Sequence, residues 1–119
     1  LLSHPRVEEV IFPLHPTFSQ IELAKRQMKG GCGLLTFTIK TQSCETIEKF
    51  CNSLKHILMA VSWGGHESLI IPKCAGLRRA DFNADLNIHR SCRLYVGLEE
   101  PEYIIADLKQ AFDVIKDLS

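Results

Sequence analysis

The stretch CRLYVGLEEPEYIIADLKQAF, from Cys92 to Phe112, combines a short strand with the most regular helix of the sequence. The apolar run from Cys92 to Val96 predicts the strand. Pro101 stands where a proline is tolerated in the first turn of a helix, and apolar residues then recur every three or four positions. That stripe consists of Ile104, Ile105, Leu108, Phe112 and Ile115. The segment therefore predicts a strand followed by an amphipathic helix.

Upstream, the same kinds of pattern predict further strands and helices. Strands are expected at Val7–Phe12, Gly33–Lys40 and Glu67–Pro72. Thr17 and Gln20 form a capping-box pair that predicts the start of one helix, which Gly30 and Gly31 end. A second helix is predicted from apolar positions at helical spacing: Ile47, Phe50, Cys51, Leu54, Ile57 and Leu58. The polar stretch Gly76–His89 has no clear period and predicts a surface loop.

This order of elements predicts a two-layer α/β sandwich, also described as α+β, with a small sheet. A length of 119 residues suits a single domain, so residues 1–119 are expected to fold as one unit. The first predicted strand begins almost at the first residue, with neither an initiating methionine nor a leader. That start favours a fragment of a longer protein.

The composition excludes several classes of partner. The 14 basic and 14 acidic residues cancel, so bulk charge favours neither nucleic acid nor an anionic membrane surface. No apolar run approaches the roughly 18 residues that cross a bilayer. Five irregularly spaced cysteines do not form the pattern of a secreted disulfide framework and favour free thiols. Together these features predict a cytoplasmic protein.

Three features are candidates for chemistry. The cysteines and histidines lack a CxxC or HxxxH pair, so no metal site is expected, and no histidine is placed by the sequence beside a nucleophile. Arg93 lies in a stretch suited to burial, so its guanidinium must reach the surface or bind an anion such as a carboxylate. Ser62, Trp63 and two glycines follow a helix and precede a strand, which suits either a ligand-binding loop or a core tryptophan.

These segments together resemble the C-terminal domain of the trans-sulfuration group of pyridoxal-phosphate enzymes. The resemblance rests on ELAKRQMKG (Glu22–Gly30), AVSWGGHESLI (Ala60–Ile70) and RLYVGLEEPEYIIADLKQAF (Arg93–Phe112), which cover most of the chain in the family's order. It implies a small, mainly antiparallel sheet of about four strands with helices on one face, as in fold-type I enzymes.

The resemblance also implies roles for particular residues. Arg93, in the RLxVGLE segment, would bind the substrate's α-carboxylate, and Ser62 would be a second contact. Trp63 stands where bacterial cystathionine β-lyases carry tryptophan, whereas γ-synthases and γ-lyases usually carry leucine. The family's Schiff-base lysine lies in a Ser-x-Thr-Lys context that is absent here, so this chain alone is expected neither to bind the cofactor nor to catalyse a reaction.

The function implied is therefore that of a C-terminal, substrate-binding domain of a pyridoxal-phosphate-dependent C–S lyase resembling cystathionine β-lyase. The expected partners are a sulfur amino acid and a large cofactor domain of the same chain, in a homodimer or homotetramer. Cystathionine γ-synthase, cystathionine γ-lyase and methionine γ-lyase remain alternatives. A free-standing, non-catalytic binding or interaction domain is the alternative of another class.

Overall fold

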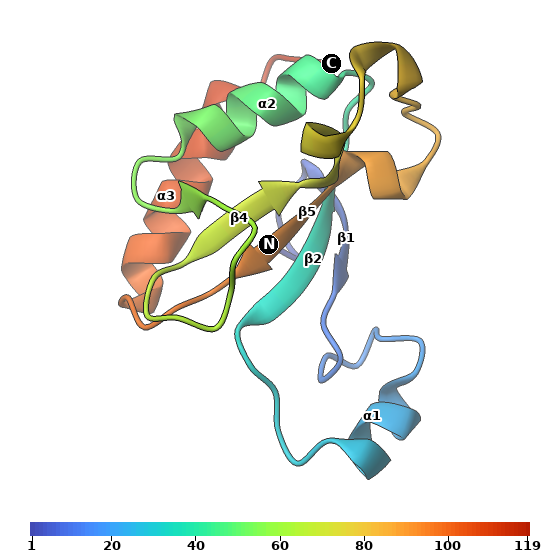
Figure 1. The fold of residues 1–119 in the computed structure, drawn as a ribbon, viewed down its shortest axis with the longest axis vertical. Coiled ribbons are helices and arrows are strands. Elements are labelled where there is room, and N and C mark those ends of the chain that lie inside the picture. Colours follow the sequence, from blue (N-terminus) through green and yellow to red (C-terminus); the bar gives the residue numbers. More distant parts are fainter.

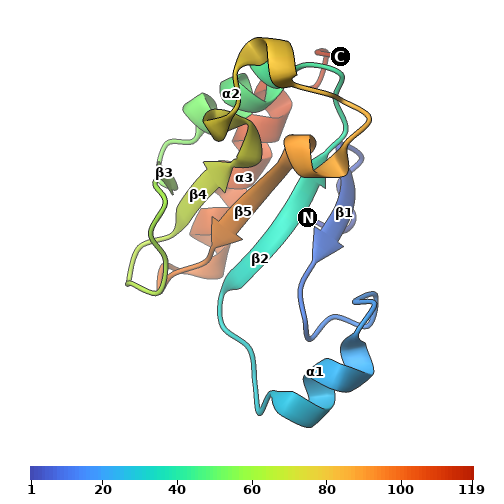
Figure 2. The ribbon, with the colours of Figure 1, turned by 45° about the vertical axis from the view of Figure 1, so that its right-hand side comes forward.

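A single twisted sheet forms the centre of the computed structural model, which describes residues 1–119 (Figure 1). Its strands are β1 (Val7–Ile11), β2 (Leu34–Ile39), β3 (Leu58–Met59), β4 (Leu69–Pro72) and β5 (Ser91–Tyr95). They lie in the order β1-β2-β5-β4-β3, which can be followed across Figure 2. All neighbours are antiparallel except β3 and β4, which are parallel. The mainly antiparallel sheet is confirmed, with five strands instead of about four.

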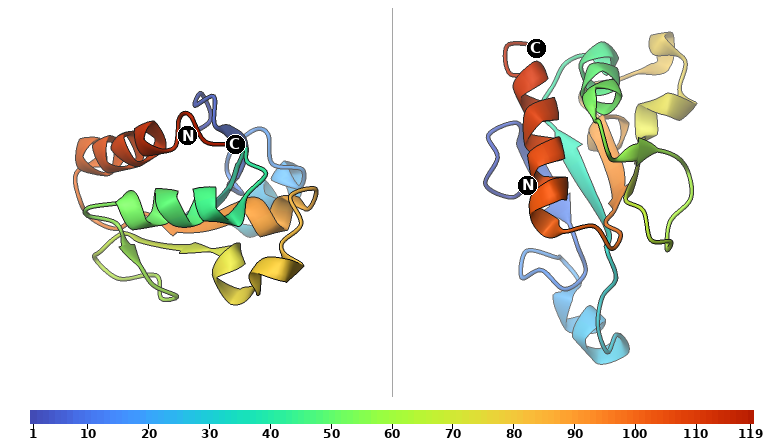
Figure 3. Two further views of the ribbon diagram at one scale, coloured as in Figure 1. Left: turned by 90° about the horizontal axis from the view of Figure 1, so that it is seen from above. Right: turned by 90° about the vertical axis from the view of Figure 1, so that its left-hand side faces the viewer.

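Two helices cover one face of this sheet and pack against each other (Figure 3). They are α2 (Cys44–Ser53) and α3 (Pro101–Val114). The shorter helix α1 (Ile21–Gln27) lies away from them, beyond the far end of the sheet (Figure 1). The opposite face of the sheet carries no long helix, so its side chains border a groove described below. No helix of the structure is long and apolar enough to cross a bilayer.

The core lies between the sheet and the α2–α3 pair. Phe37 and Ile39 of β2 are completely buried, and they alternate with Thr36 and Thr38 on the other face. Phe37 meets the rings of Phe50 and Phe112, with centroids 6.0 and 6.3 Å away. The alternation that predicted one buried face of this strand is thus confirmed. Thr38 is also buried, at 2% exposure, although it lies on the groove side.

Helix α2 is shorter than its apolar spacing predicted. It ends at Ser53, so Leu54 is its C-cap and Leu58 lies in strand β3. The buried Asp107 of α3 explains the change of direction, because its carboxylate accepts the backbone N–H groups of Lys55, His56 and Ile57 at 2.8 to 2.9 Å. Ile57 is therefore buried by a turn, not by a continuing helix. The strand β3 that this turn allows is the one that the sequence analysis missed.

Two further predictions were wrong in detail. The capping box does not form: α1 begins at Ile21, and its N-cap Gln20 makes no side-chain capping bond. The Thr17 hydroxyl instead lies 2.7 Å from His15 Nδ1. Ile105 is 62% exposed, because residue 105 lies outside the stripe that continues through Leu108 to Ile115.

The segment between β4 and β5 is a loop with three short 3-10 turns. These are η1 (Lys73–Gly76), η2 (Arg79–Asp81) and η3 (Asn87–Arg90). The predicted surface loop is therefore correct in position, and it also contains local turns. Arg90 attaches its last turn to two strands, because its guanidinium bonds the carboxylate of Glu8 in β1 and the carbonyl of Ile39 in β2.

Candidate substrate-carboxylate site

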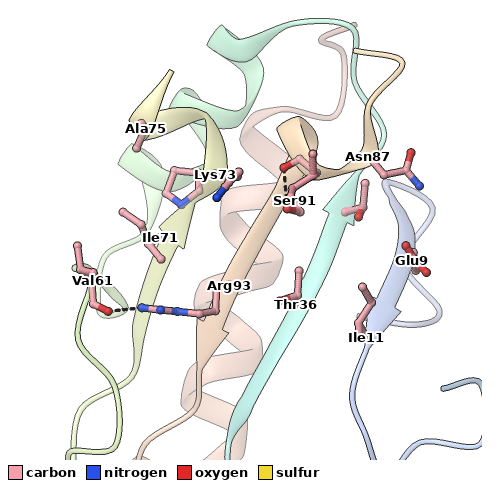
Figure 4. Close-up of a pocket in the computed structure, with 14 residues that line it drawn as sticks. Glu9, Ile11, Thr36, Val61, Ile71, Lys73, Ala75, Asn87, Ser91 and Arg93 are labelled. Carbon is pink, nitrogen blue, oxygen red and sulfur yellow. Dashed lines mark hydrogen bonds between the residues drawn. The ribbon is translucent and has the colours of Figure 1, made fainter. Parts of the chain in front are cut away.

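A groove of about 810 Å³ lies on the face of the sheet that α2 and α3 leave uncovered (Figure 4). Its floor carries hydroxyl groups from Thr36 of β2 and Ser91 of β5, and its walls include Ile71. The ionisable side chains that line it are those of Arg93, Lys73 and Glu9. None of these three forms a salt bridge within the chain. The groove therefore presents two cations and one carboxylate that have no charged partner.

Strand β5 sets the direction in which Arg93 points. Arg93 pairs with Thr36 on one side and Ile71 on the other, whereas the adjacent Cys92 and Leu94 face the helices. The side chain of Arg93 extends across β4 towards Val61 (Figure 4). Because side chains alternate along a strand, the buried neighbours leave Arg93 the groove side. Its sequence context predicts that this guanidinium reaches the surface or an anion, and in the structure Arg93 is half-buried at the groove.

The Arg93 guanidinium is oriented by backbone oxygens. Its Nη2 donates to the carbonyl of Val61 and lies 3.5 Å from that of Ser62. The structure records no partner for Nε or Nη1. A guanidinium binds a carboxylate through two parallel N–H donors, so a fixed Nη2 with free donors beside it suits an incoming carboxylate.

The structure brings Ser62 near Arg93 but leaves Trp63 largely free. The Ser62 carbonyl oxygen lies beside Nη2 of Arg93. The hydroxyl of Ser62 is exposed and makes no hydrogen bond within the chain. Trp63 is 57% exposed, so the core-tryptophan interpretation is wrong. An indole exposed beside an arginine and a groove suits contact with a ligand or another protein segment.

Two of the three segments that carry the resemblance, Ala60–Ile70 and Arg93–Phe112, are bonded directly to each other. The Glu99 carboxylate accepts from the backbone N–H and from the hydroxyl of Ser68, both at 2.7 Å. The Ser68 hydroxyl in turn accepts from Gly97 N–H at 2.9 Å, and Leu98 N–H donates to the carbonyl of His66 at 2.8 Å. The chain around Gly97 has no room for a side chain, since an added Cβ would lie 2.3 Å from the His66 carbonyl oxygen. The GLE and HES residues thus form one interlocked unit.

The ionisation of Glu99 follows from these bonds. Burial acts to raise the pKa of Glu99, but the hydrogen bonds from Ser68, a backbone hydrogen bond at Glu99 and nearby His66 together outweigh it and lower the pKa below its usual value. The carboxylate is therefore charged at neutral pH and remains a strong acceptor. Sequence patterns gave no separate sign of this role, although Glu99 and Ser68 both lie within the recognisable motifs.

The thiols do not add a nucleophile to the site. Four cysteines are buried in the core, and Cys32 alone is exposed. Burial, followed by contact with Cys44, raises the pKa of Cys74 to about 12. A buried thiol of this kind stays protonated and unreactive near neutral pH. No three His, Cys, Asp or Glu side chains lie where they could hold a metal ion.

The residues of the groove fit a carboxylate, and they do not fit covalent attachment of pyridoxal phosphate. Every lysine of the chain, including Lys73 in the groove, is exposed. A lysine that forms a Schiff base is normally desolvated or placed beside another cation so that its amine is uncharged. The groove therefore offers free guanidinium donors that suit a carboxylate, and none of the chain's lysines has the desolvated surroundings typical of a Schiff-base lysine.

Comparisons with known proteins give the family. The family described as Cys/Met metabolism PLP-dependent enzyme matches residues 1–113. An L-methionine gamma-lyase of Treponema denticola is 40% identical over 95% of this chain and 29% of its own length. A cystathionine gamma-lyase of Dictyostelium discoideum is 39% identical over 95% of this chain and 30% of its own.

A solved structure supports the same assignment. Cystathionine gamma synthase from Xanthomonas oryzae pv. oryzae, in complex with aminoacrylate and cysteine, superposes with a TM-score of 0.81 at 28% identity. The match covers 98% of this chain and 31% of that one, so the chain spans about three-tenths of the length of the relatives it matches. The chain belongs to the family of PLP-dependent enzymes of cysteine and methionine metabolism.

Proposed function

We propose that this chain is the substrate-carboxylate-binding domain of a PLP-dependent enzyme that acts on sulfur amino acids, with Arg93 as the anchor. The observation that carries the proposal is the state of the Arg93 guanidinium. Nη2 is held by the Val61 carbonyl, the other donors have no partner, and no carboxylate of the chain pairs with it. Such a group faces the groove ready to bind an anion.

Residues 1–119 form, in this proposal, a C-terminal small domain whose cofactor-binding partner domain lies elsewhere in a longer chain. The share of the relatives' length that the chain spans supports this division. A homodimeric or homotetrameric assembly in the cytoplasm completes the proposal.

The residues of this chain would act by orienting the amino-acid substrate. Arg93 fixes the α-carboxylate of the amino acid, and the Ser62 hydroxyl contributes a second polar contact. Fixing the carboxylate sets the direction of the Cα–H bond, and positioning of this kind lowers a barrier by several kcal/mol. The cofactor, when bound, supplies the electron sink for carbon–sulfur bond cleavage.

The choice between β- and γ-elimination remains a prediction. Trp63 favours a cystathionine β-lyase, whereas the relatives named above are γ-lyases and a γ-synthase. A β-lyase would release pyruvate from cystathionine, and a γ-lyase would release 2-oxobutyrate. Turnover of methionine without any product from cystathionine would contradict the β-lyase assignment.

A non-catalytic interaction domain is a second candidate, favoured by the apolar side chains exposed along one edge of the sheet. Leu58, Met59, Val61 and Trp63 are between 48% and 72% exposed. This candidate predicts that Arg93 is dispensable for activity of the complete protein.

Substitution of Arg93 in the complete protein separates the two candidates. Arg93→Ala should lower kcat/KM by about 100-fold, the effect of removing one partner of a hydrogen-bonded charge pair. Arg93→Lys should recover only part of the loss, because an ammonium lacks the planar fork. Arg78→Ala is the matched control, since Arg78 is exposed and pairs with Asp81 outside the groove. An Arg93→Ala enzyme as active as this control would refute the anchor.

A further inference from the structure

Tyr95 lies two residues after Arg93 on β5, and therefore on the same face of the strand. Its hydroxyl donates to the carbonyl oxygen of Gly65 at 2.9 Å. Arg93 and Tyr95 thus bond opposite ends of the loop formed by residues Val61 to Gly65. This loop contains both Ser62 and Trp63.

Packing does little to hold this loop in place. Val61 is 72% exposed and Trp63 is 57% exposed. Gly64 has a φ of +85°, which favours glycine, and a Cβ added there would meet no atom within 4 Å. Backbone bonds hold the chain just outside the loop, from Ala60 N–H to the carbonyl of Ile70 and from Leu98 N–H to that of His66. Within the loop apolar contacts are few, so the side-chain bonds from β5 hold it against the strand.

We propose that Tyr95 is a positioning residue that keeps Ser62 beside Arg93 while the carboxylate is bound. The inference rests on the proposed function of Arg93. A carboxylate bound through two parallel donors takes one of the free nitrogens of Arg93 together with Nη2, so Nη2 is then shared between the anion and the Val61 carbonyl. When that attachment weakens, the bond from Tyr95 to Gly65 remains and holds the other end of the loop.

The test uses Tyr95→Phe in the complete protein, since this change keeps the ring and removes only the hydroxyl. KM for the amino acid should rise about fivefold, as expected for loss of one neutral hydrogen bond, while kcat changes by less than twofold. Tyr103→Phe is the matched control. Its exposed phenol also makes a hydrogen bond, 2.6 Å from His56 Nδ1, but it lies on α3 away from the groove, so KM should not change.

A double-mutant cycle shows whether Tyr95 acts through the loop. In a Ser62→Ala background, Tyr95→Phe should have little further effect on KM, because the group that it positions is gone. Full additivity of the two changes would overturn the inference, and so would an unchanged KM in Tyr95→Phe. A fall in melting temperature with KM unaltered would assign Tyr95 a merely structural role.

Arg93→Ala, measured alongside, separates failure of this inference from failure of the proposed function. If Arg93→Ala lowers kcat/KM and Tyr95→Phe leaves KM unchanged, only the role of Tyr95 is refuted. If Arg93→Ala has no effect on kcat/KM, the carboxylate site and the role of Tyr95 are both refuted.

Discussion

The two faces of strand β5 differ in what surrounds them. Cys92 and Leu94 are 0% and 1% exposed beneath α2 and α3, whereas Arg93 and Tyr95 face the groove and bond loop carbonyls. A strand of five residues therefore contributes to the core on one face and to the candidate site on the other. Because adjacent residues face different surroundings, stability and binding can be altered separately by changing neighbouring positions of β5.

The largest expected effect on stability is that of Leu94→Ala. Removing a buried leucine side chain costs about 2 to 5 kcal/mol, because packing is lost and a cavity remains. Arg93→Ala, one residue away, should cost less than about 1 kcal/mol, since its bonds reach an exposed loop. Urea denaturation of both variants measures the difference. Equal losses of unfolding free energy would break the distinction between the two faces.

A smaller loss of unfolding free energy is expected when Asp107, the buried carboxylate of α3, is changed. Asp107→Asn should cost about 2 kcal/mol at pH 7, because a charged acceptor of three backbone N–H groups is replaced by a neutral amide. Asp113→Asn on the exposed side of the same helix is the control and should change the unfolding free energy little.

At low pH the folded protein should lose the stabilisation that the Asp107 carboxylate contributes. Burial acts to raise the pKa of Asp107, but the backbone donors of Lys55, Ile57 and His56 and the side chain of Gln110 outweigh it and lower the pKa. A lowered pKa in the folded state means that the stabilisation is complete above the unfolded value of about 4 and is lost as the pH falls through the folded value. The difference in unfolding free energy between the native protein and Asp107→Asn should therefore be smaller at pH 2 than at pH 7. A gap independent of pH would show that the charge is not what stabilises the turn.

The smallest effect on stability is expected from a substitution on the face of the sheet that borders the groove. Ile71→Ala should reduce the unfolding free energy of this chain by about 1 kcal/mol or less, since Ile71 is only half-buried where it lines the groove. Ile71 and Leu94 lie on paired strands, so the two variants compare similar side chains on opposite faces. A loss as large as that for Leu94→Ala would show that the groove is part of the core.

Much of the fold could be predicted from periodicity. The alternation in β2 and the stripe of α3 each predicted which side chains are buried, because one face of each element must meet the core. Ile105 and the end of α2 could not be predicted in this way. The apolar spacing continued past Ser53, and the turn there depends on Asp107, which is distant in sequence.

The sequence could predict which residues belong to the candidate site, but not how they lie relative to one another. Arg93, Ser62 and Trp63 were identified by the motifs in which they occur. Their relative positions, and the contribution of Tyr95, depend on hydrogen bonds to backbone oxygens. Any residue type offers such a carbonyl, so no pattern of side chains indicates which one is bonded.

Residue patterns alone were enough to indicate the family, most of the side chains that face the helices, and the position of Arg93 between two buried residues. Those properties follow from local chemistry and from the alternation of side chains along a strand. Three contacts became known from the folded chain alone: Asp107 bonds the turn after α2, Glu99 bonds Ser68, and the loop at Ser62 lies beside Arg93. These contacts join residues about 30 to 50 positions apart, and they form only when the sheet has brought the strands together.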